Sequence, residues 1–71
     1  MVKPTKVTNS IRPLRETAGL TQAELANRVG VTRQTLNAIE QGKYSPSLEL
    51  AFRISHVFSA SLDDVFQYPG E

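Results

Sequence analysis

The 71-residue chain has no cysteine and no tryptophan, and its only histidine is His56. Without cysteine there can be no disulfide, no thiolate metal site and no thiol redox switch. His56 lies near the end of a predicted helix, where a cation suits the helix dipole, so we do not expect it to bind a metal. No nucleophile, base and orienting group occur at a recognisable spacing, and no glycine-rich phosphate loop is present. We therefore expect neither an enzyme nor a cofactor.

Long hydrophobic runs are also missing. No segment approaches the roughly 18 apolar residues of a membrane span, and the N-terminal sequence MVKPTKVTNS lacks the apolar core of a secretory signal. A hydrophobic content of 39% and a charged content of 21% are those of an ordinary globular protein. We expect one domain over residues 1–71, located in the cytoplasm, with no membrane partner and no evident small-molecule ligand.

The net charge is small, but the charges are unevenly distributed along the chain. The net charge is only +1, yet residues 1–46 have seven cations and three anions, whereas residues 47–71 have one cation and four anions. One end of the domain is therefore predicted to be electropositive, and the other end to repel polyanions.

Capping residues and glycines divide the chain into five short helices. The predicted helices span about residues 9–18, 22–29, 33–41, 48–58 and 62–66. The strongest start signal is the capping box formed by Thr21 and Glu24. Ser47 caps the fourth helix, or Ser45 does so with Pro46 at the first helical position. The sequence thus predicts a compact all-α fold with a core over about residues 9–66.

The two ends of the chain lack helical periodicity. The stretches KPTKVT and VFQYPG contain β-branched or aromatic residues and proline. Two interpretations stay open at this point. Either the ends are disordered, or they pair with each other as a short antiparallel β-ribbon, which could extend across a dimer interface.

The sequence GVT between the second and third helices is typical of a helix-turn-helix. Gly30 permits a left-handed turn, Val31 fills the core between the helices, and Thr32 starts the next helix at once. Positions 33, 34, 37 and 38 then lie on the outer face, toward the helix end that enters the major groove in such motifs.

The outward side chains are flat hydrogen-bonding groups rather than ordinary solubilising ones. The fork of Arg33 fits guanine O6 and N7, and the amide of Gln34 fits adenine N6 and N7. Thr32 and Thr35 offer hydroxyls to a phosphate, or a methyl group to thymine. The competing interpretation is that Arg33, Gln34 and Asn37 are only solvated surface residues.

A family resemblance is carried by the stretch LRETAGLTQAELANRVGVTRQTLNAIEQGKYSPSLELAFRISHVF. It resembles the Cro/C1-type helix-turn-helix family, also called the Xre family, of phage and bacterial repressors. The resemblance covers about residues 10–66, and the chain is similar to the small cytolysin-repressor type without a ligand domain. It implies a five-helix, lambda-repressor-like DNA-binding domain with its helix-turn-helix at about residues 21–41.

The resemblance also implies roles for single residues. Gln22 matches a glutamine that bonds a DNA phosphate and braces the recognition helix, while Arg15 and Glu40 match a buried ion pair. The positions that match base-reading residues are Arg33, Gln34, Asn37 and Ala38, of which Ala38 is shorter than the polar residue often found there. The positions that match backbone contacts in the following loop are Lys43 and Tyr44. Alternatively, Gln22 is only a first-turn polar residue, and the last two are plain turn residues.

The leading hypothesis is therefore a homodimeric, sequence-specific DNA-binding regulator, most simply a repressor on a palindromic operator, associated with the nucleoid. The expected dimer contacts are Leu62, Phe66 and Tyr68. The alternative is a protein-binding module of the same fold, such as an antitoxin whose main partner is a toxin.

Overall fold

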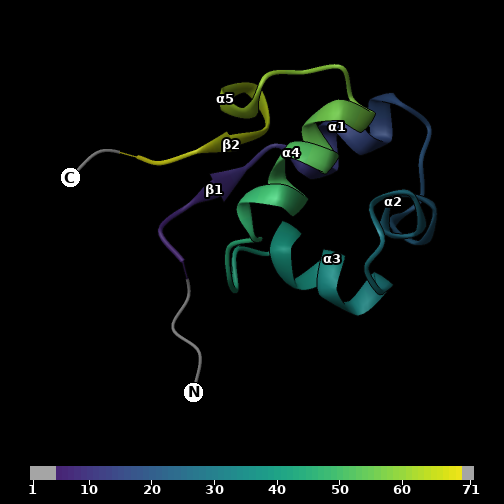
Figure 1. The fold of residues 1–71 in the computed structure, drawn as a ribbon, viewed down its shortest axis with the longest axis horizontal. Coiled ribbons are helices and arrows are strands. Elements are labelled where there is room, and N and C mark those ends of the chain that lie inside the picture. Colours follow the sequence, from purple (N-terminus) through teal and green to yellow (C-terminus); the bar gives the residue numbers. More distant parts are fainter. Residues whose placement is uncertain (1–4, 70–71) are drawn as a thin grey trace.

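The computed structural model describes residues 5–69. Its elements, in chain order, are β1 (Thr8–Asn9), α1 (Ile11–Thr17), α2 (Gln22–Val29), α3 (Arg33–Glu40), α4 (Leu48–Val57), α5 (Leu62–Val65) and β2 (Phe66–Gln67). In Figure 1 the two strands lie side by side where the chain enters and leaves the helical body, and α3 lies along another border of the molecule. The predicted terminal stretches reach into residues 3–4 and 70, which lie outside the described residues.

The helices begin where the sequence places their caps. The Thr21 hydroxyl accepts a hydrogen bond from the Glu24 main-chain N–H at 3.1 Å, and the Glu24 carboxylate accepts one from the Thr21 N–H at 2.8 Å. The hydrogen bond from the Thr21 main-chain N–H to the Glu24 carboxylate is the largest cause that lowers the pKa of Glu24, and the Thr21 hydroxyl adds to it. Ser47 caps α4 through the N–H of Leu50 at 3.2 Å, so the first of the two predicted caps is the correct one.

The ends of the described chain form a two-stranded antiparallel sheet. Thr8 is opposite Gln67, and Asn9 is opposite Phe66. Of the two interpretations of the ends, the β-ribbon is therefore confirmed for these four residues. The prediction was wrong to include Phe66 in the fifth helix and residue 9 in the first, because both residues have strand partners and Phe66 has an extended backbone. The fold is mostly helical rather than purely all-α.

The side chain of Asn9 joins this sheet to α3. Its amide nitrogen donates to the Ile39 carbonyl at 2.9 Å, and its oxygen accepts from the Ile11 N–H at 3.1 Å. Asn9 thereby provides an acceptor for an N–H in the first turn of α1. It also provides a second donor to the Ile39 carbonyl, which accepts from the Gly42 N–H at 3.0 Å as well.

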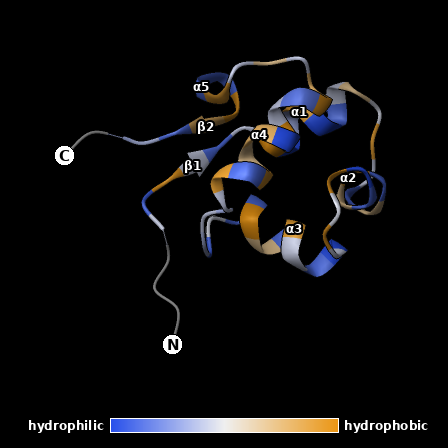
Figure 2. Ribbon diagram, in the orientation of Figure 1, coloured by the Kyte–Doolittle hydropathy of each residue, from blue (hydrophilic) through white to orange (hydrophobic). Residues whose placement is uncertain are grey.

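The core is built by all five helices. Its fully buried members are Ile11, Leu25, Ala26, Val29, Leu36, Ile39, Ile54 and Val65. Figure 2 shows hydrophobic residues in each helix, interspersed with hydrophilic ones. Leu36 and Ile39 anchor one face of α3, which leaves its opposite face open to solvent. In the described part of the chain, every helix is too short or too polar to cross a membrane.

Candidate nucleic-acid interface

A three-residue turn sets the angle between α2 and α3. Gly30 has a φ of +81°, in the left-handed region that glycine adopts without steric cost. Val31 is half-buried against the core, and Thr32 caps α3 by accepting from the Thr35 N–H at 3.1 Å. The residues GVT thus act as the sequence predicts, and they hold α3 with its first turn at the surface.

The first turn of α3 presents two long polar side chains to solvent. Arg33 and Gln34 are exposed, and within residues 5–69 neither side chain has a hydrogen bond or an ion pair. Asn37 and Ala38, one turn later, are half-buried. The four predicted base-reading positions therefore differ in solvent exposure. The two at the N-terminal end of α3 are exposed, and the two in the next turn are partly enclosed.

An open groove runs beside these residues. It has a volume of about 790 Å³, and its lining comes from α1, α2, α3 and the turn between α1 and α2. Arg12, Gln22, Arg33, Asn37 and Gln41 are among the lining residues. The groove borders α3 on the side where Asn37 lies.

Two further lining residues of this groove, Arg15 and Glu40, form a buried ion pair. The Arg15 Nε atom is 2.9 Å from Glu40 Oε2, and the two side chains are only 12% and 5% exposed. A second nitrogen of Arg15 donates to the Leu20 carbonyl at 3.0 Å. The ion pair expected between the first and third helices is present, and it fixes α3 to α1 and to the turn that follows α1.

Gln22 extends this pair into a network. Its amide nitrogen donates to Glu40 Oε1 at 3.2 Å and to Asn37 Oδ1 at 3.0 Å. Asn37 Oδ1 also accepts from the Gln41 amide at 3.4 Å. Gln22 therefore has the contacts of a residue that braces α3. Both hydrogens of the Gln22 amide are therefore engaged within the protein. A phosphate contact by Gln22 stays a prediction, and the donor left for it is the main-chain N–H of Gln22 in the first turn of α2.

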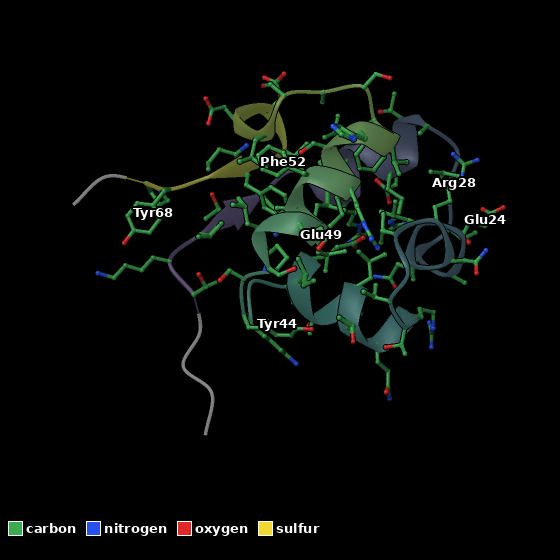
Figure 3. The ribbon with its side chains drawn as sticks, in the orientation of Figure 1. Glu24, Arg28, Tyr44, Glu49, Phe52 and Tyr68 are labelled. Atoms are coloured by element: carbon green, nitrogen blue, oxygen red, sulfur yellow. The ribbon has the colours of Figure 1, made fainter. Side chains whose placement is uncertain are left out.

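The remaining predicted contact residues lie at the two ends of α3, Thr32 and Thr35 at its start and Lys43 and Tyr44 in the loop after it. The Thr32 hydroxyl is 3.0 Å from that of Thr35, and Thr35 is half-buried. Lys43 is exposed, whereas the ring of Tyr44 packs against the core. Figure 3 shows Tyr44 in the loop that follows α3. Tyr44 is thus at least in part a structural residue, while Lys43 extends freely into solvent.

A separate apolar surface lies on the side of the sheet. Leu48, Phe52 and Tyr68 are 66%, 45% and 60% exposed, and the first two are one turn apart on α4. Leu62 and Phe66 are half-buried and line a shallow groove together with Leu48. Figure 3 shows Phe52 near β2 and Tyr68 beyond its end. We call Leu48, Phe52, Leu62, Phe66 and Tyr68 the apolar surface.

Several of these residues are not among the predicted site residues. Leu48 and Phe52 are missing from the predicted dimer contacts, although their i, i+4 spacing indicates a shared helix face. Asn9 and Gln41 are missing as well, and no local pattern distinguishes them, because their partners depend on how distant elements pack.

Comparison with known proteins places the chain among transcriptional regulators. A family model described as helix-turn-helix (HTH_3) matches residues 11–65. An uncharacterized HTH-type transcriptional regulator of Methanothermobacter thermautotrophicus is 56% identical over 57 residues, which cover 79% of this chain and 83% of the relative. YgzD of Bacillus subtilis, another such regulator, is 50% identical over 82% of this chain and 88% of its own.

A solved structure and two further relatives complete the comparison. The restriction-modification controller protein C.AhdI from Aeromonas hydrophila has a TM-score of 0.70 at 26% identity, covering 76% of this chain and 82% of its own. Antitoxin PezA of Streptococcus pneumoniae is 41% identical over 79% of this chain, and antitoxin HipB of Escherichia coli is 30% identical over 83%. The matched segments are 35% and 63% of those two antitoxins. The chain belongs to the Cro/C1-type (Xre) helix-turn-helix family of DNA-binding transcriptional regulators.

Proposed function

We propose that the protein is a homodimeric repressor that binds a palindromic operator by inserting α3 into the major groove. The observation that carries this proposal is the pair of exposed, unengaged side chains on the first turn of α3, Arg33 and Gln34. Each is suited to a bidentate contact, Arg33 with guanine and Gln34 with adenine, and each such contact contributes about 1–3 kcal/mol of discrimination. We place this activity in the cytoplasm, on the nucleoid.

Phosphate contacts would hold α3 in register. We assign them to the residues that surround the N-terminal end of α3 and its following loop, namely Gln22, Thr32, Thr35, Lys43 and Tyr44. Lys43 is exposed and carries a full charge, so it is the best placed of these to release a counterion from DNA. Phosphate contacts set affinity, whereas Arg33, Gln34 and Asn37 would set sequence preference.

The apolar surface supports a symmetric dimer. A single small domain contacts too few base pairs to define a unique genomic site. A two-fold symmetric dimer contacts twice as many, in two half-sites one helical turn apart. Large exposed apolar side chains beside an apolar groove indicate an interaction site, and Leu48, Leu62 and Phe66 line such a groove. The surface lies on the sheet side of the molecule and not on the outward face of α3, so a second copy would leave the recognition helix free.

Selection of duplexes from a random library at physiological salt, followed by footprinting, tests the DNA proposal. We expect a palindrome with half-sites about ten base pairs apart. Arg33→Ala should relax specificity at one base pair of each half-site. Lys43→Ala should weaken all sequences alike and flatten the salt dependence by about one charge. An Arg33→Ala variant that loses affinity equally on every sequence would contradict the assignment.

Sedimentation equilibrium of the pure protein tests the dimer. We expect the double variant Phe52→Ser, Tyr68→Ser to shift the equilibrium toward monomer while keeping its helical content. Ala23→Ser is the matched control, because Ala23 is exposed on α2, away from the apolar surface. A wild-type chain that stays monomeric at the concentrations where it binds DNA specifically would rule out the homodimer.

A second candidate is an antitoxin, in which the apolar surface would bind a toxin. It is favoured by the relatives that are named antitoxins, and by the size of the exposed side chains on this surface. Enrichment of duplexes without sequence or symmetry, together with a monomeric chain in solution, would place this candidate first.

A further inference from the structure

We infer that Asn37 reads DNA as a hydrogen-bond donor only, because the network behind it fixes the orientation of its amide. Its partner would be an acceptor on a base edge, such as guanine O6 or N7, adenine N7 or thymine O4. It would reject the amino groups of cytosine N4 and adenine N6. This inference rests on the proposed insertion of α3 into the major groove.

The polarity of the network begins at Glu40. A carboxylate that is ion-paired with Arg15 can only accept hydrogen bonds, so any uncharged group that contacts it must donate. The Gln22 amide lies 3.2 Å from Glu40 Oε1, and it must therefore turn its NH₂ group toward Glu40. This orientation follows from the chemistry of the carboxylate, and it holds even though amide nitrogen and oxygen have similar shapes.

The same nitrogen then determines the orientation of Asn37. Gln22 Nε2 is 3.0 Å from the Asn37 side chain, and a donor requires an acceptor opposite it, so the Asn37 oxygen faces Gln22. The Gln41 amide also donates to this oxygen, at 3.4 Å. The two lone pairs of Asn37 Oδ1 are thus both engaged within the protein.

The nitrogen of Asn37 is the group that remains free. In the part of the chain that the structure describes, Asn37 Nδ2 makes no hydrogen bond, and no buried side-chain nitrogen or oxygen lacks a partner. Asn37 is not an exposed residue, so if its Nδ2 were buried it would be among these partnered atoms. Because Nδ2 has no partner, it is not buried and must be in contact with solvent. Asn37 lines the open groove, so this nitrogen is accessible from the groove.

A donor-only asparagine reads DNA differently from an unconstrained one. An asparagine with a free amide pairs with adenine by donating to N7 and accepting from N6 at once. Asn37 cannot accept from N6, since its oxygen is already engaged on the protein side. Arg15, Glu40 and Gln22 act here as positioning residues, because they touch no base themselves.

The test compares base preferences of variants in the same duplex selection. For the wild type we expect one base pair per half-site at which an acceptor is required, and Asn37→Ala should lose about 2- to 12-fold in affinity there. Asn37→Asp has the same shape but can only accept, so it should move the preference at that base pair to a base with an amino group. Gln22→Leu frees the Asn37 amide and should broaden the preference at that base pair alone.

Gln34→Glu is the matched control, because it makes the same amide-to-acid change on the same helix outside the network. It should change the preference at a different base pair. Thermal melts followed by circular dichroism establish that each variant is folded. An Asn37→Asp variant that weakens all sequences alike, or a Gln22→Leu variant with an unchanged profile, would overturn the inference while leaving the proposed function intact. A wild type that enriches no sequence would overturn both.

Discussion

Replacing Arg15 by methionine, with Glu40 left in place, is expected to destabilise the folded protein by about 3–5 kcal/mol. The Glu40 carboxylate is 5% exposed and loses its ionic partner, so its burial is no longer compensated. Arg15 also donates to the Leu20 carbonyl, which is left without that partner. Glu40→Leu should have a similar cost, because it leaves the guanidinium buried and unpaired.

The magnitude is large for a chain of 71 residues. At about 0.05–0.15 kcal/mol per residue, the whole free energy of unfolding is about 4–11 kcal/mol. A loss of 3 kcal/mol corresponds to a decrease in Tm of roughly 12–24 °C for a domain of this size. The double variant Arg15→Met, Glu40→Leu removes both charges, and its stability should return to within about 1 kcal/mol of the wild type or exceed it.

Urea denaturation followed by far-ultraviolet circular dichroism measures these changes in a double-mutant cycle. The pair formed by Arg53 and Glu49 is an internal control, because its nitrogen–oxygen distance is also 2.9 Å but its side chains are 57% and 78% exposed. Arg53→Met should cost less than about 1 kcal/mol. Single variants of the buried pair that each cost as little as Arg53→Met, with additive effects in the double variant, would refute the reasoning.

Three further changes follow from the local structure. Gly30→Ala should cost about 1–2 kcal/mol in a thermal melt, since φ is +81° there, and Gly30→Asn should cost less. Hydrogen bonds from Thr21 hold the pKa of the Glu24 carboxyl below its ordinary value in the folded state. The stabilisation from Glu24 is therefore present above the unfolded-state pKa and is lost as the pH falls through the folded-state pKa. Urea titrations across this range should show the difference between wild type and Glu24→Ala shrinking toward acid. Asn9→Ala should cost about 1–2 kcal/mol in the same assay, because the Ile11 N–H loses its acceptor and the Ile39 carbonyl loses one of its donors.

Sequence reasoning predicts the helices well because their signals are local. The capping box at Thr21, the cap at Thr32 and the left-handed position at Gly30 each involve residues at most four apart, and the structure has all three. The terminal strands are harder to predict, since two residues per strand show no periodicity. Their register depends on Asn9 meeting Phe66 across 57 positions of sequence.

The candidate site also has features that the sequence predicts and one that it does not. The outward positions of α3 follow from helical periodicity, and the ion pair follows from a family resemblance. The orientation of Asn37 follows from neither, because it requires Gln22 on α2 and Gln41 beyond α3 to reach the same oxygen atom. Such a contact is set by the packing angle between helices, which single-residue preferences do not specify.

The buried ion pair has a second role besides stability, because Glu40 orients the Gln22 amide. A well-packed apolar pair at positions 15 and 40 would hold α1 against α3 equally well. An apolar pair, however, makes no hydrogen bond with Gln22 and so does not fix which end of the Gln22 amide faces position 40. If the Gln22 amide can take either orientation, the Asn37 amide can also take either orientation. The double variant Arg15→Met, Glu40→Leu should therefore be as stable as the wild type. Unlike the wild type, it should accept bases that present either a donor or an acceptor opposite Asn37. Full stability with an unchanged base preference would show that Asn37 takes its orientation from the DNA rather than from the protein.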